Sequence, residues 1–97
     1  MYAVIFRAKI NQVDDSYYEL AERMRELALS KYGCIEFISS TEGNSEMAIS
    51  YWNSQKQIKA WKEDKEHIKA QSLGKKVWYK SYSVQIVEVI REYGDRK

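Results

Sequence analysis

The sequence predicts an α+β domain of the ferredoxin-like, split βαβ class, in which an antiparallel sheet carries helices on one face. Two observations lead to this class. The spacing of apolar residues alternates between a period of two and a period near 3.6, in the order strand, helix, strand, strand, helix, strand. The chain also has only 97 residues, enough for one modest core, so residues 1–97 are interpreted as a single domain.

The first strand and helix are indicated by a change of period. Residues 2–10 alternate, as a strand does. Ser16 and Glu19 then have the spacing of a capping box, which predicts the start of a helix. Gly33 can adopt positive φ and so suits the end of this helix. Its apolar side is expected to contain residues at helical spacing: Tyr17, Leu20, Ala21, Met24, Leu27 and Ala28.

A β-hairpin is expected in the middle of the chain. Residues 34–40 and 46–52 alternate as strands, and residues 41–45 have the composition of a turn. Ser54 and Gln57 form a second capping box, which predicts a helix that ends at Gly74. Ile58, Trp61 and Ile68 would form its apolar side, and the charges at residues 62–66 predict a break into two short helices.

The last extended segment, residues 77–92, is too long for an ordinary strand. At about 3.3 Å per residue it would span roughly 50 Å, whereas strands usually have about 5–6 residues. It must therefore bend, split near residues 81–83, or reach beyond its own domain. Residues 93–97 are expected to fray.

The open face of the predicted sheet also needs a cover, because the strands carry apolar residues on both faces. Half a dozen apolar side chains would otherwise meet water, at a total of about 10 kcal/mol. We therefore expect the sheet to pack on the sheet of a second copy, forming a homodimer. The alternative is a monomer in which the open face of the sheet is exposed to solvent.

The composition limits the binding partners and the cellular compartment that we expect for this protein. The net charge is +2 with acids and bases interspersed, so neither nucleic acid nor an anionic membrane is an expected partner. No apolar run suits a signal peptide or a membrane helix, and a cytoplasmic location is expected. The one cysteine, Cys34, is expected to be buried and inert, and a single histidine without a Cys/His cluster predicts no metal site.

Several segments together resemble the antibiotic biosynthesis monooxygenase family. They are SYWNSQKQIKAW after the hairpin, HIKAQSLG in the following helix and the aromatic WYKSYSVQIVEV at the end. The best motif is a strand ending in Tyr51 and Trp52, followed by Ser54 and by Trp61 on the helix. The resemblance implies a dimeric α+β barrel with a pocket between each sheet and its helices. It also implies oxidation of phenolic, quinol or polyketide-type rings by O₂ without metal or flavin, so no cofactor is expected.

Seven residues are candidates for this site. The resemblance implies Trp61 as the helix tryptophan of the pocket, and His67 is a candidate proton acceptor near neutral pH. Gln57 is a candidate polar anchor. Alternative roles are a core position for Trp61 and a solvated one for His67. Candidate substrate contacts are Phe6, Trp52, Trp78 and Tyr82. Alternation places Trp78 and Tyr82 on one strand face and Tyr79 on the other.

Three functions remain open at this point. The first is a cofactor-independent oxygenase that acts on a small aromatic or quinol-type molecule. The second is a non-catalytic dimeric protein of the same fold that binds a small apolar ligand or only its partner chain. The third is an RNA-recognition sheet, which the absence of a glycine–aromatic pattern in the third strand disfavours.

Overall fold

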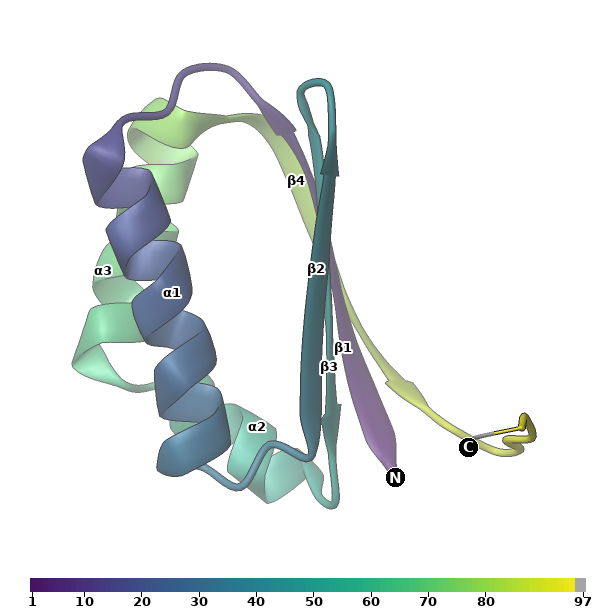
Figure 1. Cartoon of the computed structure of the whole chain (residues 1–97). Coiled ribbons are helices and arrows are strands. Elements are labelled where there is room, and N and C mark those ends of the chain that lie inside the picture. Colours follow the sequence, from purple (N-terminus) through teal and green to yellow (C-terminus); the bar gives the residue numbers. More distant parts are fainter. Residues whose placement is uncertain (96–97) are drawn as a thin grey trace.

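The computed structural model describes residues 1–95 as an antiparallel sheet covered on one face by helices, as predicted (Figure 1). Fraying is predicted for residues 93–97, and two of these residues, 96 and 97, lie outside the described range. The elements in chain order are β1 (Tyr2–Ile10), α1 (Asp15–Ser30), β2 (Glu36–Glu42), β3 (Ser45–Trp52), α2 (Gln55–Lys62), α3 (Lys65–Leu73), a π-helical turn (Gly74–Trp78) and β4 (Tyr79–Glu88).

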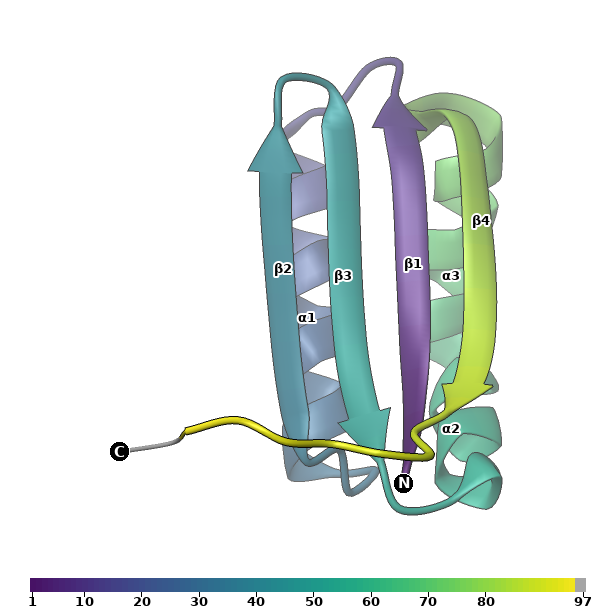
Figure 2. The ribbon, with the colours of Figure 1, turned by 90° about the vertical axis from the view of Figure 1, so that its right-hand side faces the viewer.

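The sheet has the strand order β2-β3-β1-β4, so the first strand lies in the centre (Figure 2). All neighbouring pairs are antiparallel. This order follows from the split βαβ connection, in which each helical segment carries the chain across the sheet. The predicted ferredoxin-like class is therefore confirmed.

Alternation along β1 divides the sheet into two chemically different faces. Val4 and Phe6 point toward the helices, and Val4 belongs to the buried core. Ile5 lies between them on the open face, directly opposite Ile49 of β3, which in turn lies opposite Ile38 of β2. The core between sheet and helices is a cluster of buried residues: Val4, Met24, Leu27, Ala28, Cys34, Trp52, Ile58 and Trp61.

The first helix begins earlier than the sequence predicts. Asp14, and not Ser16, is its N-cap: the Asp14 carboxylate accepts a hydrogen bond from the backbone N–H of Tyr17 at 3.2 Å. Asp and Ser cap almost equally well, so two adjacent candidates cannot be separated by composition. The extended backbone at Asp14 decides between them. The end of α1 is as predicted, with Gly33 at a φ of 82°.

The predicted break between α2 and α3 is confirmed, and the residue that caps α3, Asp64, also contacts the end of α1. Ser54 caps α2 as predicted, and Asp64 caps α3 by accepting from the backbone N–H of Glu66 at 2.8 Å. The other carboxylate oxygen of Asp64 accepts a hydrogen bond from the Tyr32 hydroxyl at 2.6 Å. Asp64 thus joins the end of α1 to the start of α3. Ile68, predicted to be apolar core, is instead 53% exposed because α3 turns that side outward.

The second strand begins and ends two residues later than predicted. β2 runs over Glu36–Glu42 and not over residues 34–40, because the turn after Gly33 places Cys34 in the core before pairing begins. Burial raises the pKa of the Cys34 thiol, in agreement with a buried, unreactive cysteine. Among residues 1–95 no helix is long and apolar enough to cross a membrane.

The last strand is shorter than its hydrophobic run. It covers Tyr79–Glu88, because residues 77 and 78 belong to the π-helical turn and residues 89–92 continue past the sheet pairing. Gly74 is the C-cap of α3, as predicted, but a π-helical turn follows directly. Gly74 keeps a right-handed conformation and starts that turn. The chain neither splits near residues 81–83 nor runs as one long strand. Its pairing with β1 shifts once, at Lys80.

The Asp64 junction can be tested against a simpler cap. Asp14→Ala removes one cap bond and should lower the free energy of unfolding by about 1 kcal/mol. Asp64→Ala should cost clearly more, since it also leaves the Tyr32 hydroxyl without its acceptor. Urea denaturation measures both. Equal losses would contradict the assignment of Asp64 as a junction between two helices.

Candidate functional site

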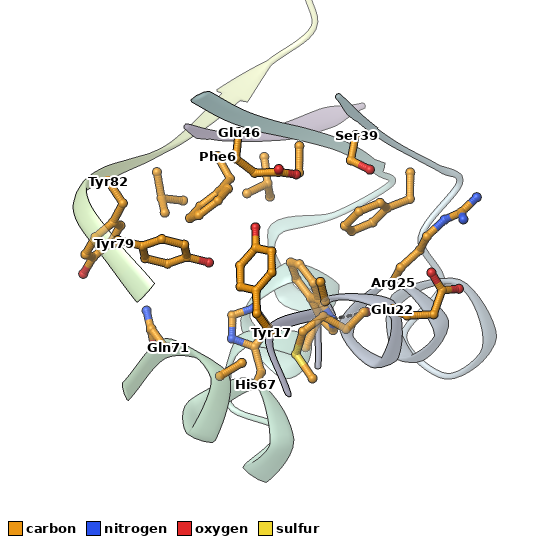
Figure 3. Close-up of a pocket in the computed structure, with 18 of the residues that line it drawn as sticks. Phe6, Tyr17, Glu22, Arg25, Ser39, Glu46, His67, Gln71, Tyr79 and Tyr82 are labelled. Carbon is orange, nitrogen blue, oxygen red and sulfur yellow. Dashed lines mark hydrogen bonds between the residues drawn. The ribbon is translucent and has the colours of Figure 1, made fainter. Parts of the chain in front are cut away.

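A cavity of about 460 Å³ lies between the helix-facing side of the sheet and the helices α1, α2 and α3. Phe6, Val84 and Tyr82 of the sheet form one side, and Trp61 and His67 of the helices form the other. The remaining wall residues are Val4, Tyr17, Tyr18, Ala21, Glu22, Met24, Arg25, Phe37, Ser39, Thr41, Glu46, Ala48, Lys62, Ala70, Gln71 and Tyr79. Figure 3 shows how these side chains converge from the sheet and from the helices.

Trp61 forms the inner wall of the cavity and is held on several sides. Its indole Nε1 donates a hydrogen bond to the backbone carbonyl of Met24 at 3.1 Å, so its one polar atom is satisfied. Its ring packs against Trp52 at 5.2 Å and, nearly perpendicular, against Phe37 at 6.2 Å. With 6% exposure, Trp61 offers an apolar, rigid surface to a ligand.

His67 lies edge-on against Trp61, with 4.4 Å between the ring centres. Burial, together with the nearby Lys62 ammonium, lowers its pKa from 6.5 to about 4, although Asp64 acts in the opposite direction. Its Nδ1 atom is buried and has no hydrogen-bond partner within residues 1–95. The imidazole is therefore neutral at physiological pH, and it is a weaker base than the sequence led us to expect.

Two tyrosines occupy the end of the cavity next to β4. Tyr17 comes from α1 and Tyr79 from the start of β4, and their hydroxyls point into the space between the layers (Figure 3). Burial raises the pKa of Tyr79 to about 12, with help from the Glu46 carboxylate. Burial also raises the pKa of Tyr17, and Tyr79 and Glu46 add to this effect. Both phenols therefore remain protonated at any physiological pH.

The structure brings four of the seven candidate residues to the cavity wall: Trp61, His67, Phe6 and Tyr82. It places the other three elsewhere. Trp52 is fully buried behind Trp61 and donates to the Ser50 hydroxyl at 2.9 Å. Trp78 lies in the core beneath the Tyr17 ring, with 5.2 Å between the ring centres. The Gln57 side chain lies against Gly33, so Gln57 does not converge with Trp61 and His67.

The prediction that Tyr79 and Tyr82 lie on opposite faces of the last strand is wrong, because the strand contains a bulge. The register with β1 pairs Tyr82 with Ala8 and Tyr79 with Ile10, two residues of β1 that share a face. One residue, Lys80, is left over as a β-bulge, and an extra residue reverses the alternation beyond it. Tyr79 and Tyr82 therefore both face the cavity, while Trp78 does not.

Four residues of the cavity wall were not among the candidates predicted from the sequence: Tyr17, Glu46, Gln71 and Tyr79. Tyr17 had a usable signal, since its position on the apolar side of α1 already predicted burial. Tyr79 had none, because its orientation depends on the bulge. Among the described residues, no group of three or more His, Cys, Asp or Glu side chains is arranged to hold a metal ion.

Comparison with solved structures identifies the fold. The structure matches Rv0793 of Mycobacterium tuberculosis with a TM-score of 0.81 and 12% identity, over 96% of this chain and 98% of that one. It matches SnoaB, a cofactor-independent oxygenase of Streptomyces nogalater, with a TM-score of 0.78 and 8% identity, over 97% of both chains. An antibiotic biosynthesis monooxygenase gives a TM-score of 0.79 at 13% identity, over 94% of this chain and all of the other. The chain thus has the fold of the antibiotic biosynthesis monooxygenases.

At the level of sequence, the relationship is with one bacterial protein of no assigned function. The chain is 38% identical over 93 residues to the uncharacterized protein YqjZ of Bacillus subtilis (strain 168), covering 94% of this chain and 81% of the relative. It therefore belongs to the same family as YqjZ. No family model matches the sequence.

The lowered pKa of His67 gives a direct test of the cavity's environment. As this is the chain's only histidine, its ring protons give one NMR titration curve, and we expect a midpoint near pH 4. Lys62→Gln should move the midpoint upward. Because the unfolded chain titrates near 6.5, stability should be complete above that pH and decrease toward pH 4 by up to about 3 kcal/mol. A midpoint near 6.5 would show a solvated imidazole.

Proposed function

We propose that this chain is a cofactor-independent monooxygenase that oxidises a small aromatic or quinol-type molecule with O₂. The observation that carries the proposal is the aromatic-lined cavity in which a neutral His67 lies against Trp61. The presence of the same fold in SnoaB, itself a cofactor-independent oxygenase, supports it. Such a reaction needs no group beyond an electron-rich substrate that passes an electron to O₂.

The residues of the cavity suit the protein's share of this chemistry. Trp61, Phe6 and Phe37 provide flat apolar surfaces that hold a ring and exclude water. His67 is unprotonated at neutral pH, so it accepts a hydrogen bond from a ring hydroxyl and increases the electron density of the ring. The Lys62 ammonium, close enough to affect His67, stabilises negative charge that develops on the substrate.

A second candidate function is binding of the same kind of ring without turnover. The lowered pKa of His67 favours it, because a base with a pKa of about 4 removes a proton from a phenol poorly. Under this alternative the cavity holds its ligand through shape and apolar contact alone. Tight binding of an aromatic ligand without any product would support it.

We further propose that the protein acts as a homodimer formed through the open face of the sheet. Ile5, Ile49 and Ile38 form a row across this face, flanked by Met47 and Val87. Ile38, Met47 and Val87 remain 37–49% exposed, and burial of a large apolar side chain is worth about 1.5–3 kcal/mol. A second copy supplies a matching face. The reducing cytoplasm is the proposed location, in keeping with a free, buried Cys34.

Oxygen consumption tests the catalytic proposal. Wild-type protein should consume O₂ with at least one member of a panel of quinols and phenols, and Trp61→Phe and His67→Gln should each lower kcat/KM tenfold or more. Ile68→Ala is the matched control on α3, since Ile68 lies next to His67 in sequence but faces solvent. Absence of turnover, or equal turnover by all variants, would reject the proposal.

Light scattering after size-exclusion chromatography tests the dimer. Wild-type protein should elute with twice the mass of one chain. Ile49→Glu should elute as a monomer, because a carboxylate at the centre of the open face would be buried without a partner. Ile68→Glu places the same charge on exposed helix surface and should leave the dimer intact. A monomeric wild-type protein would contradict the proposal.

A further inference from the structure

Tyr17 and Tyr79 form a polar end to a cavity whose other walls are mainly apolar. We propose that their hydroxyl groups are a subsite that binds a carbonyl oxygen on one edge of a neutral ring ligand. The inference rests on the proposed function, because it takes the same cavity to be the ligand site and names the chemical class that fits it. The residues are supplied by two different layers, α1 and β4.

Packing holds both rings in place without any ligand. The Tyr17 ring meets Trp78 nearly at a right angle, with 5.2 Å between the ring centres. The Tyr79 ring packs on Phe6 at 5.4 Å. Gly74 leaves the space that Tyr79 occupies, since a Cβ atom there would lie 2.4 Å from the tyrosine ring. A subsite built from fixed side chains binds without the entropy cost of ordering them.

Both hydroxyls can donate a hydrogen bond to a ligand. Both stay protonated, as burial and the Glu46 carboxylate disfavour the phenolate. Each phenol has one proton. The two ring centres lie 6.3 Å apart, so both protons lie at the same end of the cavity. Figure 3 shows both hydroxyls pointing into the cavity beneath Phe6 and Glu46.

The charges around the cavity favour a ligand without net charge. Glu46 at the tyrosine end would repel an anion, and it is already engaged by the Thr41 hydroxyl. Lys62, near His67, would repel a cation at the other end. An uncharged ring with a carbonyl group accepts a hydrogen bond from a phenol hydroxyl at one end and meets Trp61 and His67 at the other. Neutral aromatic ketones and quinones are therefore the expected class.

A matched pair of ligands isolates the carbonyl group: 9-fluorenone and fluorene have the same ring system, and only the first has a carbonyl oxygen. Binding of each to the purified 97-residue chain is followed by quenching of tryptophan fluorescence, since Trp61 lies in the cavity wall. Tyr17→Phe and Tyr79→Phe should each weaken fluorenone binding about five- to tenfold, the usual size of one lost hydrogen bond. Fluorene binding should not change.

Tyr2→Phe is the control, because Tyr2 is partly buried beside the core but is not part of the cavity wall. It should bind both ligands like wild type. Unchanged fluorene binding by Tyr17→Phe and Tyr79→Phe also shows that these variants fold. Equal affinity of wild type for the two ligands, or an equal loss of both in the variants, would overturn the subsite.

The result of this binding experiment can be distinguished from the result of the oxygen-uptake experiment. If fluorenone is discriminated as expected while no quinol supports O₂ uptake, the subsite stands and the oxygenase proposal fails. If O₂ uptake is found but fluorenone and fluorene bind alike, the subsite fails and the oxygenase proposal stands. If neither ring binds to wild type, the cavity does not accept this class and the inference is rejected.

Discussion

The structure depends most on how Trp61 is held between the two layers. Its Nε1 donates to the Met24 carbonyl of α1, while its ring packs on Trp52 of the sheet and on His67 of α3. With Phe37 of β2 included, one side chain on α2 therefore contacts four other elements. Large aromatic side chains contribute strongly to a small core, and a satisfied indole N–H allows this one to be buried without a desolvation cost.

The cavity is a consequence of this arrangement. With Trp61 and the core fixed at one end, α1 and α3 stand away from the sheet at the other, where tyrosines and small residues such as Ala21, Ala48 and Ala70 line the gap. The two helices are joined outside the cavity by the Arg23–Glu66 ion pair at 2.7 Å and by the Tyr32–Asp64 hydrogen bond. Polar contacts thus join the helices outside the cavity, whereas the cavity wall itself is mainly apolar.

The two faces of the sheet have different roles in the proposed function. The helix-facing side presents Phe6 and Tyr82 to a ligand, and the open side presents the isoleucine row to a second copy. Since neighbouring residues of β1 point to opposite faces, a change of register by one residue would exchange ligand-facing and partner-facing side chains. The pairing of β1 with β3 and β4 therefore bears on both the site and the interface.

The sequence alone determined the order of the elements, the cap of α2 at Ser54 and the break before α3, because these depend on local periodicity and local hydrogen bonding. It also singled out Trp61 and His67, which do meet. Only the tertiary structure decided that Trp52 and Trp78 are core and that Tyr79 faces the cavity. Periodicity shows which side of an element is buried. It does not show whether that side faces a helix or a cavity, or whether a bulge interrupts the element. The one-residue bulge at Lys80 has no sequence signal, and it reverses the orientation of Tyr79.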